Sequence, residues 1–221
     1  MDSYIICGTP RTGSTLLCDL LASTQVAGNP DSFFMKDVDP FWAERWALPV
    51  RNGVSDKGYC AAYLKAVIAA GSGQTSIFGL RLMIENLDDL TSMSEKVYPD
   101  ARSDMEGLQF AFGEILYIHL TREDKLAQAI SMVKAEQTGL WHIGPDGTEL
   151  ERLAQPEEPR YQFNRIASKI EELERFDAAW LNWFDEQGII PLRITYETLS
   201  QSSIEAVGLI CTQSGCARAV A

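Results

Sequence analysis

The stretch from residue 4 to residue 21 constrains the fold more than any other part of the chain. Residues 4–7 (Tyr-Ile-Ile-Cys) form a short apolar run typical of a buried strand, and the apolar residues of 14–21 recur at helical spacing. Between them, residues 8–13 (Gly-Thr-Pro-Arg-Thr-Gly) form a turn bounded by glycines. A strand that passes through such a turn into a helix directs unpaired backbone N–H groups and the positive end of the helix dipole at one place. The stretch therefore predicts a cradle for a phosphate or a sulfate.

The amino-acid sequence of this turn differs from that of the Walker A loop, G-x-x-x-x-G-K-[ST]. Ser14 stands after Gly13 where nucleoside triphosphatases have lysine, and the positive charge is supplied within the loop by Arg11. Without that lysine, hydrolysis of ATP or GTP is a poor interpretation. Ser14 and Thr15 add hydroxyl donors to the first helical turn. The alternative is a strand–helix turn that binds no ligand.

Length and charge limit the classes of function. A chain of 221 residues can form one large α/β domain, and a net charge of −12 argues against a general nucleic-acid surface. It does not exclude one small anion in a locally positive pocket. No apolar run is long enough to cross a membrane, no secretory signal is visible, and the five cysteines lack paired spacing. We therefore expect a reduced, cytoplasmic enzyme without a zinc site.

Strand and helix patterns alternate along the rest of the chain. This alternation predicts a P-loop-like, three-layer α/β fold, in which helices flank a mostly parallel sheet. The strands are expected at 76–83, 114–122 and 189–196, and the helices at 56–70, 88–97, 126–133, 161–187 and 203–210. Residues 99–107 read as a polar loop, 139–160 as a lid or substrate loop, or alternatively a surface insert, and 211–221 as a disordered or truncated tail of a single domain spanning 1–221.

Several side chains outside the loop are candidates for the site. Arg81 and Arg122 follow apolar runs, at the carboxyl edge where open parallel sheets bind ligands; Arg81 can equally be a surface cation. Asp31 lies in a turn close to the cradle, either as a functional acid or as a cap. His119, inside a strand, reads as a core residue more readily than as a catalyst. The aromatic run 41–46 either packs or lines an acceptor site.

The order of short motifs along the chain supports a family resemblance. The motifs are residues 9–17, Gly28-x-Pro30-x-x-Phe33-Phe34, Gly79-x-Arg81-Leu82-Met83, residues 118–124, Gln128-Ala129-Ile130-Ser131, the Trp141 region, Trp180-x-x-Trp183-Phe184, and residues 191–199. With this set the chain resembles the sulfotransferases that use 3′-phosphoadenosine 5′-phosphosulfate. It most closely resembles the bacterial trehalose 2-sulfotransferase-like (Stf0-type) family.

The resemblance implies a reaction and two anion sites. The sulfuryl group would pass in line, without a metal, to a hydroxyl of a carbohydrate or small metabolite, and Arg11 would stabilise the charge of the leaving group. The residues implied to hold the 5′-phosphosulfate are Arg11, Thr12, Gly13, Ser14 and Thr15, and those implied to hold the 3′-phosphate are Arg122 and Ser131.

The candidate for the base that accepts the hydroxyl proton comes from the turn before the aromatic pair. In the resembled family the proposed base is a glutamate just before the aromatic pair, and this chain has Ser32 there, with Asp31 one residue earlier. Asp31 is therefore the expected catalytic base, with His119 and His142 as alternatives.

Three further points follow from the resemblance. Family members carry a further basic C-terminal segment where this chain has the small residues of 211–221, hence the expectation of a truncated product.

The rival functions are a small-molecule kinase of related fold and a nucleotide-binding remnant without catalysis. The expected partner is a small-molecule or glycan acceptor, and a homodimer is left open.

Overall fold

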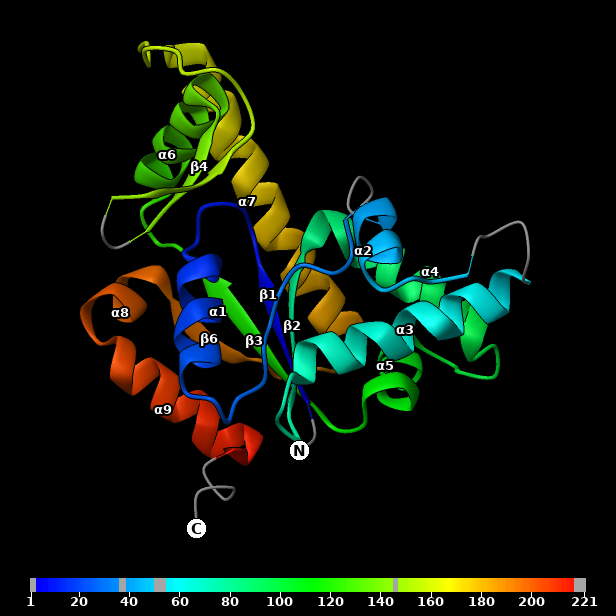
Figure 1. The fold of residues 1–221 in the computed structure, drawn as a ribbon. Helices are drawn as coiled ribbons and strands as arrows, with labels where there is room; N and C mark the ends of the chain where they lie inside the picture. The colour runs from blue at the N-terminus through cyan, green and yellow to red at the C-terminus, as the bar shows by residue number, and fades with distance from the viewer. Residues whose placement is uncertain (1–2, 36–38, 50–54, 145–146, 217–221) are drawn as a thin grey trace.

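Four parallel strands form the central sheet of the computed structural model, which describes residues 3–35, 39–49, 55–144 and 147–216 (Figure 1). The strand order is β2-β1-β3-β6. The strands are β1 (Ser3–Gly8), β2 (Phe78–Met83), β3 (Ile115–Thr121) and β6 (Leu192–Thr195). The expectation of a mostly parallel sheet is confirmed, and β1 lies in its middle.

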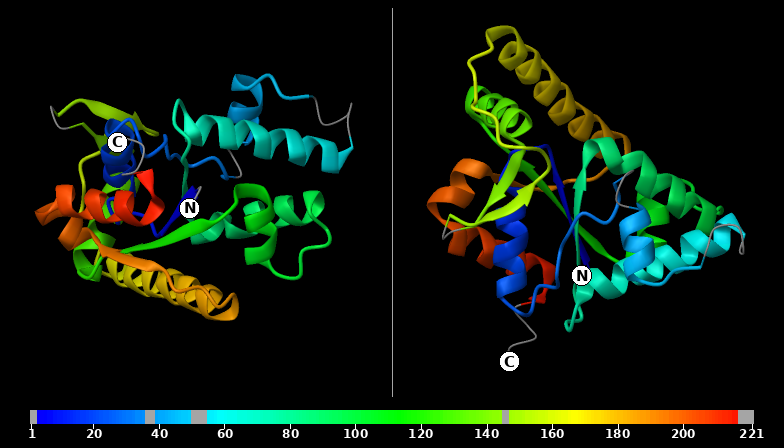
Figure 2. Two further views of the ribbon diagram at one scale, coloured as in Figure 1. Left: turned by 90° about the horizontal axis from the view of Figure 1, so that it is seen from below. Right: turned by 45° about the horizontal axis from the view of Figure 1, so that its top comes forward.

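Helices cover both faces of the sheet (Figures 1 and 2). One face carries α1 (Ser14–Ser23), α8 (Tyr196–Gln201) and α9 (Ser203–Ser214), and the other carries α3 (Asp56–Ser72), α4 (Leu87–Val97), α5 (Asp104–Phe112) and part of α7 (Phe163–Glu186). Side chains of β1 alternate between them: Tyr4 and Ile6 pack toward α1 and α9, and Ile5 and Cys7 pack toward α3 and α7. Burial on both faces explains why the strand is apolar throughout.

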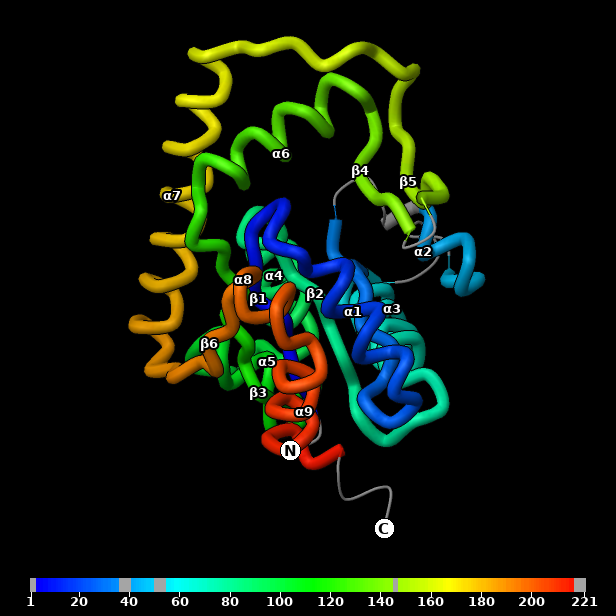
Figure 3. Tube along the Cα trace, turned by 90° about the vertical axis from the view of Figure 1, so that its left-hand side faces the viewer, coloured from blue at the N-terminus to red at the C-terminus, as the bar shows by residue number. Residues whose placement is uncertain are grey.

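A helical pair and a hairpin rise from the carboxyl edge of the sheet (Figures 1 and 3). Helix α6 (Lys125–Thr138) packs on α7 through a small cluster that includes Val133 and Leu173. It leads into an antiparallel hairpin of β4 (Leu140–Ile143) and β5 (Glu149–Arg152). The segment expected as a lid or substrate loop therefore contains a two-stranded sheet beside the first loop. No helix in the described part of the chain is long and apolar enough to span a membrane.

Three segments with local expectations from the sequence are helical in part. Residues 99–107 are not all loop, because α5 begins at Asp104: the Ser103 hydroxyl caps the helix by accepting the N–H of Glu106 at 3.2 Å. Helix α9 runs to Ser214, into the expected tail, and residues 217–221 lie outside the described part. The aromatic run lies mostly in α2 (Asp39–Arg45), where Trp42 and Trp46 stack and pack on Phe33. A short 3₁₀ turn, η2 (Ile84–Asn86), precedes α4.

Trp180 joins α7 to the start of the first loop. Its side chain is fully buried and stacks on Phe184, and its indole N–H donates to the carbonyl of Gly8 at 2.9 Å. The last residue of β1 is thus held by a side chain of α7, far along the sequence.

We expect Trp180→Ala to lower the free energy of unfolding by about 3–5 kcal/mol, because it leaves a cavity and an unpaired carbonyl. Trp180→Phe should cost less, since it keeps much of the ring volume. Urea unfolding measures both, with Tyr161→Ala as the control, because Tyr161 is 81% exposed. A Trp180→Ala protein as stable as the Tyr161→Ala protein would contradict this account.

Candidate active site

The loop between β1 and α1 has the backbone geometry of an anion cradle. Arg11 and Gly13 both lie in the left-handed region, with φ of 67° and 80°. Gly13 is the N-cap of α1, and no side chain of the described residues caps the helix. The N–H groups of the first helical turn therefore point to one place without a side-chain partner, at the positive end of the helix.

Packing against Tyr196 requires glycine at position 13. A Cβ placed on Gly13 would lie 2.7 Å from Cδ2 of Tyr196, which begins α8. The positive φ favours glycine as well. Tyr196, the residue that follows the last strand and begins α8, thus forms one wall of the first loop.

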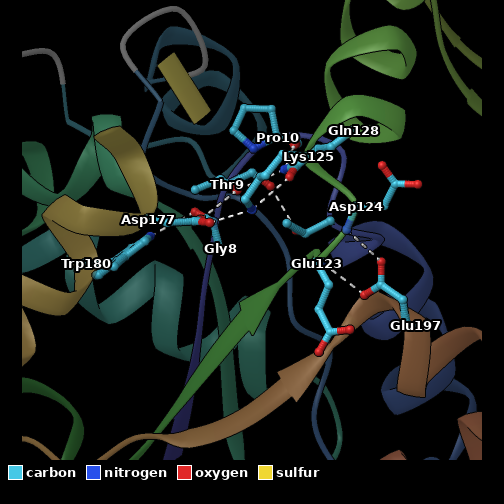
Figure 4. A network of polar contacts seen from close by, with 11 residues as sticks. Gly8, Thr9, Pro10, Glu123, Asp124, Lys125, Gln128, Asp177, Trp180 and Glu197 are labelled. Carbon is cyan, nitrogen blue, oxygen red and sulfur yellow. Dashed lines mark hydrogen bonds and ion pairs between the residues drawn. The ribbon is translucent and has the colours of Figure 1, made fainter. Parts of the chain in front are cut away.

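A buried hydrogen-bond network holds the loop from behind (Figure 4). The side-chain amide of Gln128 in α6 donates to Thr9 Oγ1 at 3.1 Å and to the carbonyl of Pro10 at 2.7 Å. Lys125 Nζ donates to Gln128 Oε1 at 3.0 Å and lies 2.5 Å from Asp177 Oδ2 on α7. Gln128 is fully buried, so its amide makes these hydrogen bonds in place of the hydrogen bonds to water that it would make in the unfolded chain. The loop is therefore fixed by α6 and α7.

Two arginines lie close together at this loop, Arg11 within it and Arg122 beside it. Arg11 Nε donates to Ser131 Oγ at 2.9 Å, and Arg11 Nη1 donates to the carbonyl of Trp141 at 2.5 Å. Arg122 Nη1 donates to the carbonyl of Arg11 at 3.3 Å, and its guanidinium lies 4.3 Å from the ring centre of Tyr196. Arg11 and Ser131, expected on different anion groups, are thus in direct contact.

The electrostatics of this pair favour an anion. Burial lowers the pKa of Arg11, and the positive charge of Arg122 lowers it further. The Nε of Arg122 is buried and has no hydrogen-bond partner among the described residues. A phosphate or sulfate between the arginines would reduce their repulsion and accept this N–H. The groups at the site thus fit an anionic ligand.

The cradle opens into a cavity of about 610 Å³, a size suited to a nucleotide. Its polar lining comes from the loop, α1, α6, the hairpin and α8. These polar residues include Arg11, Ser14, Thr15, Arg122, Ser131, His142 and Tyr196. Of the expected loop residues, Thr12 differs: its hydroxyl is buried and donates to the carbonyl of Thr9 at 2.8 Å, which leaves only its backbone for a ligand.

A third arginine lies at the same edge of the sheet. Arg81 Nη1 donates to Thr15 Oγ1 at 2.5 Å, and Arg81 Nε donates to Ser32 Oγ at 2.8 Å. Its Nη2 lies 3.6 Å from Asp31 Oδ1. The side chain is only 15% exposed, so Arg81 is a positive group of the edge and not a surface cation. The guanidinium of Arg81 thus lies between Asp31 and Thr15 of the cradle.

The two histidines occupy different environments. His142 lines the cavity, with its Nε2 3.2 Å from Thr15 Oγ1 and 3.0 Å from Glu151 Oε2. His119 is buried in β3 edge-on to Phe184, and its Nε2 has no hydrogen-bond partner within the part of the chain that the structure describes. His119 is absent from the described residues that line the cavity. Of the two alternative bases, only His142 faces the cradle.

Comparison with known proteins decides the family. The family model described as Stf0 sulphotransferase matches residues 3–220. This chain belongs to the Stf0 sulphotransferase family. Trehalose 2-sulfotransferase of Mycobacterium tuberculosis (strain ATCC 35801 / TMC 107 / Erdman) is 28% identical over 216 residues, which cover 89% of this chain and 78% of that protein. The protein of the same name from Mycolicibacterium smegmatis (strain ATCC 700084 / mc(2)155) is 28% identical over 233 residues, covering 96% and 84%.

Two contributors to this Stf0 site were missed from the sequence. Tyr196 follows the last strand, and the rule that ligands bind at the carboxyl edge of a parallel sheet would have found it. Glu151 lies on β5 and meets His142 through the hairpin register. No spacing in the sequence indicated that pairing.

We expect Gly13→Ala to destabilise the protein more than Gly147→Ala. Both positions have positive φ, but no atom of the described residues lies within 4 Å of a Cβ at Gly147, whereas Tyr196 blocks one at Gly13. The additional cost should be about 1–3 kcal/mol, as for overpacking elsewhere. Urea unfolding measures it, and adding Tyr196→Ala to Gly13→Ala should recover part of the loss. Equal losses for the two alanine variants would contradict the steric role of Tyr196.

Proposed function

We propose that this chain transfers the sulfuryl group of 3′-phosphoadenosine 5′-phosphosulfate to a hydroxyl of a carbohydrate. The observation that carries the proposal is the meeting of Arg11, Arg122 and Ser131 above the uncapped N-terminus of α1. Such a donor has two anionic groups, and the site offers two adjacent positive groups. The five cysteines form no disulfide in the described part of the chain, which fits a reducing, cytoplasmic setting.

Each group at the site has a defined task in this proposal. The loop backbone with Ser14 and Thr15 would hold the 5′-phosphosulfate, and Arg122 with Ser131 would hold the 3′-phosphate. The donor, when bound, supplies an activated sulfuryl group. Arg11 would stabilise the negative charge that develops on the leaving oxygen, a contribution worth about 10²–10³ in rate.

Carbohydrate is the acceptor class that the relatives support. Both are named trehalose 2-sulfotransferase. Asp31 and Ser32 flank Arg81 beside Thr15, so we place the acceptor at this side of the cradle and keep Asp31 as the catalytic candidate from the sequence. Trehalose itself is not assigned, because Ser32 stands where the resembled family has its glutamate.

Calorimetry can separate this proposal from a kinase of related fold. Adenosine 3′,5′-bisphosphate should bind, and ADP with magnesium should bind much more weakly. Arg122→Ala should weaken bisphosphate binding about 10–100-fold, as expected for losing a hydrogen bond to a charged group. Arg102→Ala is the control, because Arg102 is exposed and pairs with Glu106 on α5. Tight binding of ADP without binding of the bisphosphate would rule out the sulfotransferase proposal.

Transfer of labelled sulfate to a panel of sugars can separate an enzyme from a remnant. The wild-type chain should label at least one sugar, and Arg11→Ala should lower that rate about 10²–10³-fold with the fold intact by circular dichroism. A wild-type chain that binds the bisphosphate but labels no sugar would be a nucleotide-binding remnant. An unchanged rate in Arg11→Ala would remove Arg11 from the mechanism.

A further inference from the structure

The β4–β5 hairpin places a histidine–glutamate pair directly over the cradle. His142 and Glu151 are cross-strand partners, and His142 Nε2 lies 3.0 Å from Glu151 Oε2. The same nitrogen lies 3.2 Å from Oγ1 of Thr15, which is in the first turn of α1. The imidazole is thus one hydroxyl away from the loop that would hold the sulfuryl group.

The hydrogen-bond partners indicate which ring nitrogen is free. The carboxylate of Glu151 only accepts hydrogen bonds, and Thr15 Oγ1 already accepts one from Arg81 Nη1. Nε2 of His142 therefore carries the proton and donates it to Glu151. This leaves the lone pair on Nδ1. A carboxylate that fixes the tautomer of a histidine in this way also stabilises the imidazolium that forms when the ring takes up a second proton.

Charges from four surrounding segments act on His142. Burial lowers its pKa, and Arg81 on β2 and Arg11 in the first loop lower it further. Glu151 on β5 and Asp19 on α1 act in the opposite direction, and the net shift is downward from 6.5. The imidazole is therefore neutral at pH 7 and ready to accept a proton.

We propose that Nδ1 of His142 is the base that takes the proton of the acceptor hydroxyl, and that Glu151 is its positioning residue. This inference rests on the proposed function. As the hydroxyl oxygen forms its bond to sulfur, the bond from sulfur to the bridging oxygen breaks, and the electron pair stays on the leaving phosphate. The proton passes to Nδ1, and the carboxylate of Glu151 stabilises the imidazolium.

The geometry favours His142 over Asp31. Asp31 Oδ1 accepts the N–H of Ser32 at 2.7 Å and faces Arg81 Nη2 at 3.6 Å. Among the described residues it therefore connects to Thr15 through Arg81, and it is absent from those that line the cavity, whereas His142 lines it. We assign Asp31 to holding Arg81 and the acceptor, with proton transfer to Asp31 as the competing outcome of the test.

Kinetic variants test the assignment. His142→Gln should lower kcat about 10²–10⁴-fold, as for loss of a general base, and leave the affinity for adenosine 3′,5′-bisphosphate within about twofold. Wild-type kcat should fall on acidification through the pKa of His142, and His142→Gln should lack this acidic limb. Glu151→Gln removes a group that raises this pKa, so its limb should move to lower pH. Glu149→Gln, on the same strand but paired with Arg152, is the matched control and should behave as the wild type.

A second measurement does not depend on activity. The chain has two histidines, so the ring signals of His142 can be assigned by NMR from the signal lost in His142→Gln. In the free protein, His142 should titrate below 6.5, lower still in Glu151→Gln and unchanged in Glu149→Gln. Equal titration in all three proteins would overturn the positioning role of Glu151.

The outcomes separate this inference from the proposed function. A wild-type enzyme that transfers sulfate, with kcat and the acidic limb kept in His142→Gln, would overturn the inference alone, and loss of the limb in Asp31→Asn would then move the base to Asp31. In His142→Gln, a rise in KM for the acceptor with kcat unchanged would mean that His142 binds the acceptor and does not take its proton. Failure of the wild-type chain to bind the bisphosphate would reject the function, and the inference with it.

Discussion

The rest of the site depends on how Gln128 holds the first loop from behind. Its buried amide satisfies two loop acceptors, Thr9 and Pro10, while the ion pair of Lys125 and Asp177 joins α6 to α7 at the same place. In a low-dielectric interior these bonds are costly to leave unmade, so the loop has few alternative shapes. The cradle is therefore organised before any anion arrives, as electrostatic catalysis requires.

Positive charge is concentrated at one edge of an otherwise acidic molecule. The net charge is −12, yet three arginines from the loop, β2 and the end of β3 lie around the first turn of α1. Burial lowers the pKa of Arg11, and the positive charge of Arg122 lowers it further, so the two arginines repel each other. An anion relieves this repulsion, whereas a neutral ligand of the same shape does not. The protein's own charges thus favour an anionic ligand at this edge.

Sequence patterns predicted the parts of the fold that depend on local structure. The strand, turn and helix around Arg11, the parallel sheet and the membership of the family are confirmed. Helix α5 was missed because its capping signal, Ser103 with Glu106, lies in a polar segment. The contact of Arg11 with Ser131 spans 120 residues, and that of His142 with Glu151 depends on hairpin register. Neither follows from spacing along the chain, because both arise only when the elements pack.

Tyr196 has a consequence for how the chain acquires its site during synthesis. The cradle begins at residue 8, but one of its walls is a ring near the other end of the chain, and the adjacent Glu197 accepts the N–H groups of Glu123 and Asp124 (Figure 4). A nascent chain therefore makes the loop early and encloses it late. Until β6 and α8 have left the ribosome, β1 has its loop but not the wall that Tyr196 supplies, so the loop reaches its final form only after elements that are made later.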